Sequence, residues 1–291
     1  MQNKEEWKWA FIFLLPSLLG VGIFVAIPVL ASFGLSFAHW NMLSPPKFVG
    51  LQNYTELIAD PLFWKVMGNT FYYALAVVVL EIPIALGLAI AMNQSGWVTK
   101  VFRTIYFLPV VTSMVAIALV WNWMYDPQYG LLNGLLSSVG LPKVEWLYST
   151  FWAMPALIIM GVWKNVGYSM VLFLAGLQTI PEELYEAASL DGANRWQQFL
   201  NVTLPQLGPT LFFVSVMSTI TAFQVFDPVY IMTQGAPANS TNVAVYWLYQ
   251  NAFEFFNVGR ASAIAYMLFG VILALTLVQW SLRKRWVDLE S

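Results

Sequence analysis

Long apolar segments alternate with short polar stretches along this chain, and six such segments can be distinguished. Each is close to the about 20 residues that an α-helix needs to cross the hydrocarbon core of a bilayer. The pattern therefore predicts an all-α polytopic membrane protein, with six transmembrane helices in a single domain over residues 1–291. The first segment is too long for the apolar core of a signal peptide and lacks a convincing cleavage site, so we expect a retained helix. The six segments are residues 10–37, 67–92, 104–125, 151–175, 207–232 and 261–282.

Composition supports this placement in a membrane. Hydrophobic residues make up 59% of the chain and charged residues only 10%, whereas about a quarter of the residues of a typical soluble domain are charged. The chain has too few charges to cover a water-facing surface, so a lipid bilayer is its expected surrounding. The absence of cysteine excludes disulfides and thiolate sites, and the single histidine, His39, excludes a multi-histidine metal site. The net charge of −2 argues against nucleic acid as a partner.

Lysine and arginine are distributed unevenly between the two sides of the predicted membrane. With six spans the two termini share a side, and that side carries eight of these residues against four on the other. Because cytoplasmic loops are enriched in lysine and arginine, we expect both termini to be cytoplasmic. The residues on the side of the termini are Lys4, Lys8, Lys100, Arg103, Arg195, Arg283, Lys284 and Arg285.

The connection between the fourth and fifth segments, residues 179–205, combines several charges with signals for helices. Thr179 and Glu182 have the spacing of a capping box, and Gly192 can end a first helix in the left-handed conformation that suits glycine. A second short helix over residues 194–201 follows. A plain surface loop would not need this regularity, so we expect two short helices that form a docking surface.

The same loop carries a spacing of residues that is found in a transporter family. Glu186-Ala187-Ala188 is followed after three residues by Gly192, and after nine more by Val202-x-Leu204-Pro205. This spacing resembles the EAA motif of binding-protein-dependent ABC transporter permeases. The rest of the chain resembles the carbohydrate permeases of this family, of the maltose permease (MalF) type. It departs from them in having Ala236 where glycine is usual, and in lacking the extra N-terminal helices and large insertion of the maltose permease. The resembling segments are residues 163–168, 174–178, 230–237 and 258–263.

The resemblance implies a type I ABC importer permease fold and a division of labour among subunits. No P-loop sequence G-x-x-x-x-G-K-[ST] occurs, so we expect a transport subunit that is not an enzyme and holds no cofactor, with ATP and Mg on a partner ATPase. The family places the 179–205 loop against an ABC ATPase dimer. It also pairs the permease with a second, MalG-like permease subunit and an extracytoplasmic solute-binding protein, in the inner membrane of a bacterial-type cell. By this resemblance the ATPase-coupling residues are Glu186, Ala187, Ala188 and Gly192.

Ionisable residues inside the apolar segments are candidates for a solute pathway, because charge is costly to place in a membrane. Glu81, Lys164 and Asp227 are such residues. They could line a polar cavity, or Glu81 and Lys164 could pair between helices as a structural link. Both interpretations stay open at this stage.

Polar side chains also share faces of two predicted helices. Lys164, Asn165 and Tyr168 share a face of the fourth span, and Ser218 and Thr221 share a face of the fifth. Such groups suit a sugar, which needs hydrogen-bond partners and a flat ring for its apolar face. The resemblance implies that Tyr168 and Ser218 contact the sugar; ordinary polar packing between helices is the alternative. The candidate substrate-binding residues are Tyr168, Asn165, Lys164, Ser218, Thr221 and Gln224.

Taken together, the residues and the resemblance predict a permease subunit that forms half of an import pathway for a sugar or polyol, such as an oligosaccharide, disaccharide or glycoside. A self-contained secondary transporter is the alternative, but it would more often show internal repeats and several intramembrane acids. A membrane enzyme would need a convergent set of catalytic groups, and His39, Asp126 and Glu145 are too scattered to form one.

Overall fold

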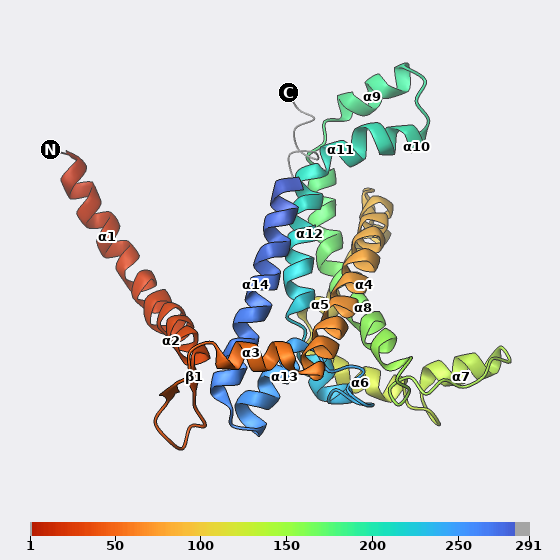
Figure 1. Ribbon diagram of the computed structural model, residues 1–291. Helices are drawn as coiled ribbons and strands as arrows, with labels where there is room; N and C mark the ends of the chain where they lie inside the picture. Colours follow the sequence, from red (N-terminus) through yellow and green to blue (C-terminus); the bar gives the residue numbers. More distant parts are fainter. Residues whose placement is uncertain (1, 283–291) are drawn as a thin grey trace. The chain divides into compact units, whose positions relative to one another are not determined.

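The computed structural model describes residues 2–282, with side chains from residue 7 onward. The basic cluster at 283–285 and the side chain of Lys4, on which the expected orientation partly rests, lie outside the described residues. The described chain is mostly helical, which confirms the predicted all-α class (Figure 1). The elements are α1 (Gln2–Val21), the π-helical turn η1 (Gly22–Ala26), α2 (Ile27–Ser36), β1 (Ala38–His39), β2 (Lys47–Phe48), α3 (Gln52–Ala59), α4 (Pro61–Met92), α5 (Trp97–Val111), α6 (Met114–Met124), α7 (Leu131–Ser138), α8 (Ala153–Leu177), α9 (Glu182–Leu190), α10 (Arg195–Gln198), the π-helical turn η2 (Phe199–Thr203), α11 (Leu204–Gln206), α12 (Gly208–Phe223), η3 (Val229–Thr233), α13 (Ala244–Tyr249), η4 (Gln250–Glu254) and α14 (Val258–Leu282).

The chain forms two compact units. The first comprises the residues up to Phe63 together with Trp247–Phe269, and the second comprises Trp64–Tyr246 together with the residues from Gly270 on. In the first unit, α1, η1 and α2 form one apolar helix whose side chains are exposed almost throughout. A helix of this length and composition can cross a membrane, as the first apolar segment predicts.

A buried asparagine orders the chain that follows this helix in the first unit. Asn53 of α3 donates hydrogen bonds to the carbonyl oxygens of Ser36 (2.8 Å) and Ala38 (3.0 Å). Ala38 also belongs to β1, which pairs antiparallel with β2. Arg260 of α14 forms an ion pair with Asp60, between α3 and α4. These contacts hold together the polar connections at the ends of the apolar helices.

The second unit is a helical bundle whose core lies where α4, α8 and α12 meet (Figure 1). Met170 and Phe173 of α8 are fully buried there, against Ala85 and Ala89 of α4 and Val214 of α12. The small residues of α4 allow close approach of the large side chains of α8. α8 is therefore the central helix on which polar groups can be placed between neighbours.

The third predicted span, residues 104–125, is not one continuous helix. α5 ends at Val111 and α6 begins at Met114, and the two helices are bent by 101°. Thr112 and Ser113 between them are extended, with ψ angles of 143° and 132°. The prediction of one continuous helix was wrong. The end of α5 is stabilised by Lys164 of α8, and the apolar pattern of residues 104–125 does not reveal a contact with a residue so far along the chain.

The fifth predicted span, residues 207–232, is shorter than expected. α12 ends at Phe223. In a continuous helix the N–H of residue 228 would bond to the carbonyl of Gln224, and Pro228 has no N–H to donate; it instead stands at the start of the separate π-helical turn η3. At its other end, the helical stretch Arg195–Gln206 leads into α12 across a bend of 68°. Among the described residues, four helices can span a membrane singly, and six spans result if each of the two bent pairs counts as one.

Asp126 serves the turn that follows α6. Its Oδ1 accepts hydrogen bonds from the backbone N–H groups of Tyr129 (2.7 Å) and Gln128 (2.9 Å). These bonds stabilise the carboxylate and hold the pKa of Asp126 below its ordinary value. A structural turn thus accounts for this acid, which is isolated from other candidate catalytic groups in the sequence.

Candidate functional site

A small polar cavity lies in the second unit between α4, α8 and α12, with a volume of about 140 Å³. Five of the six side chains proposed from the sequence to bind a solute line it, so the two polar helix faces open onto one common space. The five are Lys164, Asn165, Tyr168, Ser218 and Thr221.

Gln224 is the proposed residue that does not line this cavity. It lies just after the last residue of α12, where it caps the helix, and it is exposed. Asp227 lies still further along and is exposed as well. The predicted helix continued to residue 232, with Gln224 about 120° from Ser218 and Asp227 nearly opposite it; both residues instead follow the end of α12.

Tyr168 and Asn165 present the groups best suited to a sugar. The Tyr168 side chain is 43% exposed although it lies in the middle of α8, which leaves its ring free to contact a solute. Asn165 is half-buried on the same wall. Ser218 is buried and Thr221 is exposed on the opposing helix. An aromatic face and several hydrogen-bonding groups therefore surround one space.

Glu81 of α4 is buried at the same cavity, with 3% of its surface exposed. Its Oε1 accepts hydrogen bonds from Ser169 Oγ of α8 (2.5 Å) and Ser218 Oγ of α12 (3.2 Å). One carboxylate oxygen thus links three helices. The sequence marks Glu81 as an intramembrane acid, but its place beside Tyr168 and Ser218 depends on serine partners that are 88 and 137 residues away.

Lys164 does not pair with Glu81. Its Nζ donates to the carbonyl oxygens of Pro109 and Val110, the latter at 2.8 Å. Both carbonyls belong to the last turn of α5, where the helix dipole favours a cation. The Pro109 carbonyl also accepts from the Thr112 N–H (3.3 Å). Lys164 therefore caps the broken third span, and the direct ion pair considered from the sequence is not formed.

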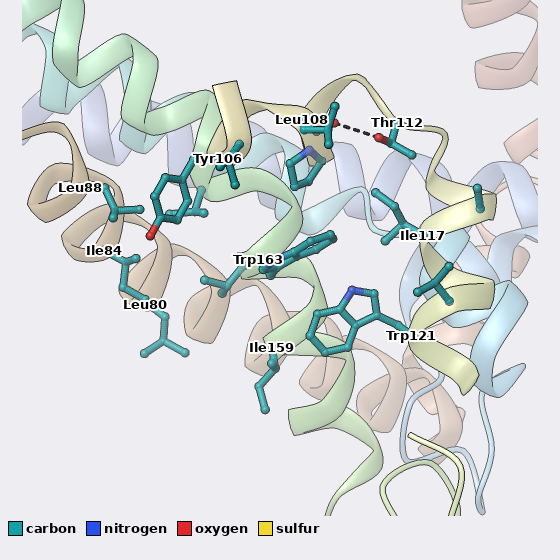
Figure 2. A pocket seen from close by; sticks show the side chains of 16 residues that line it. Leu80, Ile84, Leu88, Tyr106, Leu108, Thr112, Ile117, Trp121, Ile159 and Trp163 are labelled. Carbon is teal, nitrogen blue, oxygen red and sulfur yellow. Dashed lines mark hydrogen bonds between the residues drawn. The ribbon is translucent and has the colours of Figure 1, made fainter. Parts of the chain in front are cut away.

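A larger groove of about 750 Å³ lies beside the bend between α5 and α6. Figure 2 shows Trp163 of α8 next to Trp121 of α6, with ring centroids 5.5 Å apart. The Thr112 hydroxyl on its rim is turned to the carbonyl oxygen of Leu108 (2.9 Å). Most of the remaining wall is aliphatic. A polyhydroxylated solute needs several hydrogen-bond partners, so the smaller polar cavity fits it better than this groove.

The 179–205 loop forms two short helices, as predicted, but the first begins differently. α9 starts at Glu182 directly after Pro181, without a side-chain cap. Thr179 instead donates to the carbonyl oxygen of Gly176 (2.7 Å) in the last turn of α8. The predicted capping box of Thr179 and Glu182 was wrong, because the Thr179 hydroxyl is used by the preceding helix.

A capping box is present at the second helix. Asn194 accepts hydrogen bonds from the N–H groups of Trp196 and Gln197, and the Gln197 side chain accepts one from the Asn194 N–H. The helical stretch then runs through Arg195–Gln206 and not only to residue 201. The π-helical turn η2 directly precedes α11, which contains Pro205, so the helix continues without a break at the proline. α10 is therefore joined almost directly to α12.

Gly192 ends α9 in the left-handed conformation, as predicted, with φ +79°. The Ala193 N–H donates to the Ala188 carbonyl (2.9 Å) and the Gly192 N–H to that of Ser189 (3.0 Å), which is the Schellman arrangement. A Cβ at position 192 would meet nothing within 4 Å. The backbone conformation, and not lack of space, is what requires glycine here.

Side-chain bonds hold the two helices of this hairpin (residues 182–206) together. Gln198 Nε2 donates to Ser189 Oγ (2.8 Å), and the hydroxyls of Tyr185 and Thr203 share a hydrogen bond (2.9 Å). Figure 1 shows the hairpin projecting past one end of α8 and α12. Leu190 at its tip is 89% exposed and Trp196 is 66% exposed. Of the proposed coupling residues, Ala188 is half-buried and the others are exposed: Glu186, Ala187 and Gly192.

Replacing Asn194 by alanine is expected to loosen the start of α10. The loss of a side-chain N-cap costs about 1 kcal/mol, which corresponds to a rise of about fivefold in the exchange rate of the Trp196 and Gln197 amides. Amide hydrogen exchange on the purified protein measures this. Asn194→Ser retains the cap and should exchange like the wild type; equal protection in the alanine variant would contradict the capping role.

Comparison with known proteins agrees with this architecture. Residues 82–286 match the family described as binding-protein-dependent transport system inner membrane component. The chain is 40% identical over 280 residues to the probable ABC transporter permease protein YurN of Bacillus subtilis, covering 94% of this chain and 95% of that protein. It is 35% identical over 275 residues to the trehalose/maltose transport system permease protein MalF of Thermococcus litoralis, covering 94% and 93%.

A solved structure shares the fold over nearly the full length. One chain of a bacterial ABC transporter involved in the import of the acidic polysaccharide alginate superposes with a TM-score of 0.85 at 25% identity, covering 98% of this chain and 97% of that one. The family match alone covers more than two thirds of the sequence. The chain therefore belongs to the inner membrane components of binding-protein-dependent transport systems, the multi-pass permease subunits of ABC transporters.

Proposed function

We propose that this permease imports a sugar or polyol and forms half of the pathway. The observation that carries the proposal is the polar cavity, where the Tyr168 ring and the polar groups of Asn165, Ser218 and Thr221 surround one space. Rings cover the apolar face of a sugar, and amide and hydroxyl groups bind its hydroxyls. A relative named for trehalose and maltose transport supports the same solute class.

The hairpin supports a role in coupling the pathway to ATP hydrolysis. No P-loop occurs in the sequence, so ATP and Mg would be held by a separate ABC ATPase dimer. That dimer would seat the part of the hairpin that carries Glu186, Ala187, Ala188 and Gly192. Acidic and large apolar side chains exposed together are typical of a surface that another protein covers.

Two further partners complete the proposed importer. A second, MalG-like permease subunit would supply the other half of the pathway, and an extracytoplasmic solute-binding protein would deliver the solute. The six spans predicted from the sequence would put the hairpin and both termini on one side of the membrane. A hairpin that meets a cytoplasmic ATPase would then mean that both termini are cytoplasmic.

Tyr168→Ala tests the solute site. Uptake of labelled trehalose and maltose by the reconstituted transporter is expected to fall about tenfold, which corresponds to about 1.4 kcal/mol of lost binding. Basal ATPase activity should stay near the wild-type level, because Tyr168 lies within α8 and not on the hairpin. Tyr168→Phe keeps the ring and should retain most uptake.

Two outcomes would contradict the proposed site. Unchanged uptake by Tyr168→Ala would remove the cavity from the solute pathway. An equal loss of uptake and basal ATPase activity would point to misfolding or lost coupling in place of lost solute binding.

A further inference from the structure

Glu81 has no structural counter-charge to explain its burial. Among the described residues it is the only buried one that carries a charge, and the only ion pair in that part of the chain is Asp60 with Arg260. Lys164, on the same cavity, is bonded to backbone carbonyls instead. A charge inside a membrane protein is costly and usually serves a pathway. A link between helices alone could be made by a neutral side chain.

The two oxygens of the Glu81 carboxylate are used differently. Both serine hydroxyls, of Ser169 and Ser218, donate to Oε1. Oε2 accepts no hydrogen bond from the described residues, yet the side chain lines the cavity. An ionised carboxylate oxygen is a strong acceptor, so the cavity wall offers a position for a donor that the protein itself does not supply.

We propose that Glu81 is a solute-binding residue: Oε2 accepts hydrogen bonds from hydroxyl groups of a neutral sugar or polyol, and the carboxylate makes the pathway select against anionic sugars. This rests on the proposed function and names the charge class of its solute. A hydroxyl donates to Oε2 and accepts from a neighbouring donor, as on Asn165 or Thr221. A carboxylate on the solute would meet a like charge where screening by water is weak.

Glu81→Gln separates this role from a purely structural one. The amide oxygen of glutamine can still accept from Ser169 and Ser218, so the link between α4, α8 and α12 is retained. The amide nitrogen then takes the place of Oε2 and presents a donor to the cavity. A structural role predicts little change, whereas a binding role predicts a loss for hydroxyl donors. Ser169→Ala is the matched control, because it removes one link and leaves the carboxylate in place.

The experiment compares maltose with the analogue in which one primary alcohol is oxidised to a carboxylate. Uptake is measured in proteoliposomes that contain the complete transporter, at a saturating concentration of the solute-loaded binding protein. Because the binding protein is identical for every variant, a changed ratio between the two solutes arises in the permease.

The expected result has two parts. Glu81→Gln lowers maltose uptake about tenfold, the lower end of what a hydrogen bond to a charged group contributes, and it lowers the preference for maltose over the acid by at least about fivefold. Ser169→Ala keeps the wild-type preference. An unchanged preference or an unchanged maltose uptake in Glu81→Gln overturns the proposal.

Two further outcomes have defined meanings. If Glu81→Gln does not assemble, Glu81→Asp decides: retained preference for maltose supports the role of the charge, and lost preference overturns it. If an assembled wild-type transporter hydrolyses ATP but moves none of a panel of neutral sugars, the proposed function fails. That result differs from a wild type that moves maltose and a Glu81→Gln variant that matches it, which overturns only the role of Glu81.

Discussion

Replacing Lys164 by methionine is expected to reduce solute uptake to background. Methionine keeps most of the length of the side chain but removes the ammonium group that caps Pro109 and Val110. The Val110 carbonyl then loses its hydrogen-bond partner, which costs about 1–3 kcal/mol where no water replaces it, whereas the Pro109 carbonyl keeps its bond from the Thr112 N–H. The bend between α5 and α6 would then be lost or shifted, together with the wall that Val110 gives to the cavity.

The measurement combines uptake with the thermal stability of the detergent-solubilised protein. Lys164→Met should lower the midpoint of unfolding as well as uptake, because the change removes a fold-determining contact. Lys164→Arg retains a cation with several donors and should recover a substantial part of both. Full stability of the methionine variant with lost uptake would instead indicate a direct solute contact. Wild-type uptake would contradict both roles.

Gly192→Val should reduce uptake to less than about a tenth of the wild-type level. A β-branched residue rarely adopts a positive φ, and holding it at the φ of +79° costs about 1–3 kcal/mol. The turn would relax, and the Schellman bonds to Ala188 and Ser189 would be lost. The hairpin would then present a changed surface to the ATPase proposed to bind it.

Gly192→Asn is the matched control for this change. Asparagine tolerates the left-handed conformation, and a Cβ meets nothing within 4 Å at this position, so uptake should stay close to normal. Solute-stimulated ATPase activity of the complete transporter is the second readout. A valine variant with normal uptake and normal stimulation would show that the turn does not take part in coupling.

The sequence predicted the continuous helices and the two polar helix faces of this protein well, because those features are local. The 3.6-residue period and the apolar length of residues 61–92 and 153–177 are properties of continuous stretches. The left-handed end of α9 at Gly192 is likewise a local preference of glycine. Lys164, Asn165 and Tyr168 share a face by helix geometry alone, and the structure places all three at one cavity.

The features that sequence reasoning missed depend on contacts between distant residues. The break after Val111 is stabilised by Lys164, 54 residues away from Val110, and an apolar pattern cannot reveal it. The misplaced capping box has the same cause, since Thr179 could serve either the helix before it or the helix after it. Glu81 was visible as an unusual residue, but its place at the cavity required knowledge of Ser169 and Ser218 across two other helices.

The order built into the hairpin has a mechanical consequence. A loop that folds only on binding loses about 2–5 kcal/mol of its interaction energy to ordering, and it also yields when it is pushed. This hairpin is stiff before any contact, because the cap at Asn194, the turn at Gly192 and the Gln198–Ser189 bond are already formed. Its second helix continues to Gln206, one residue before α12. A displacement applied at the turn would therefore reach the bend before α12 with little of it absorbed within the hairpin.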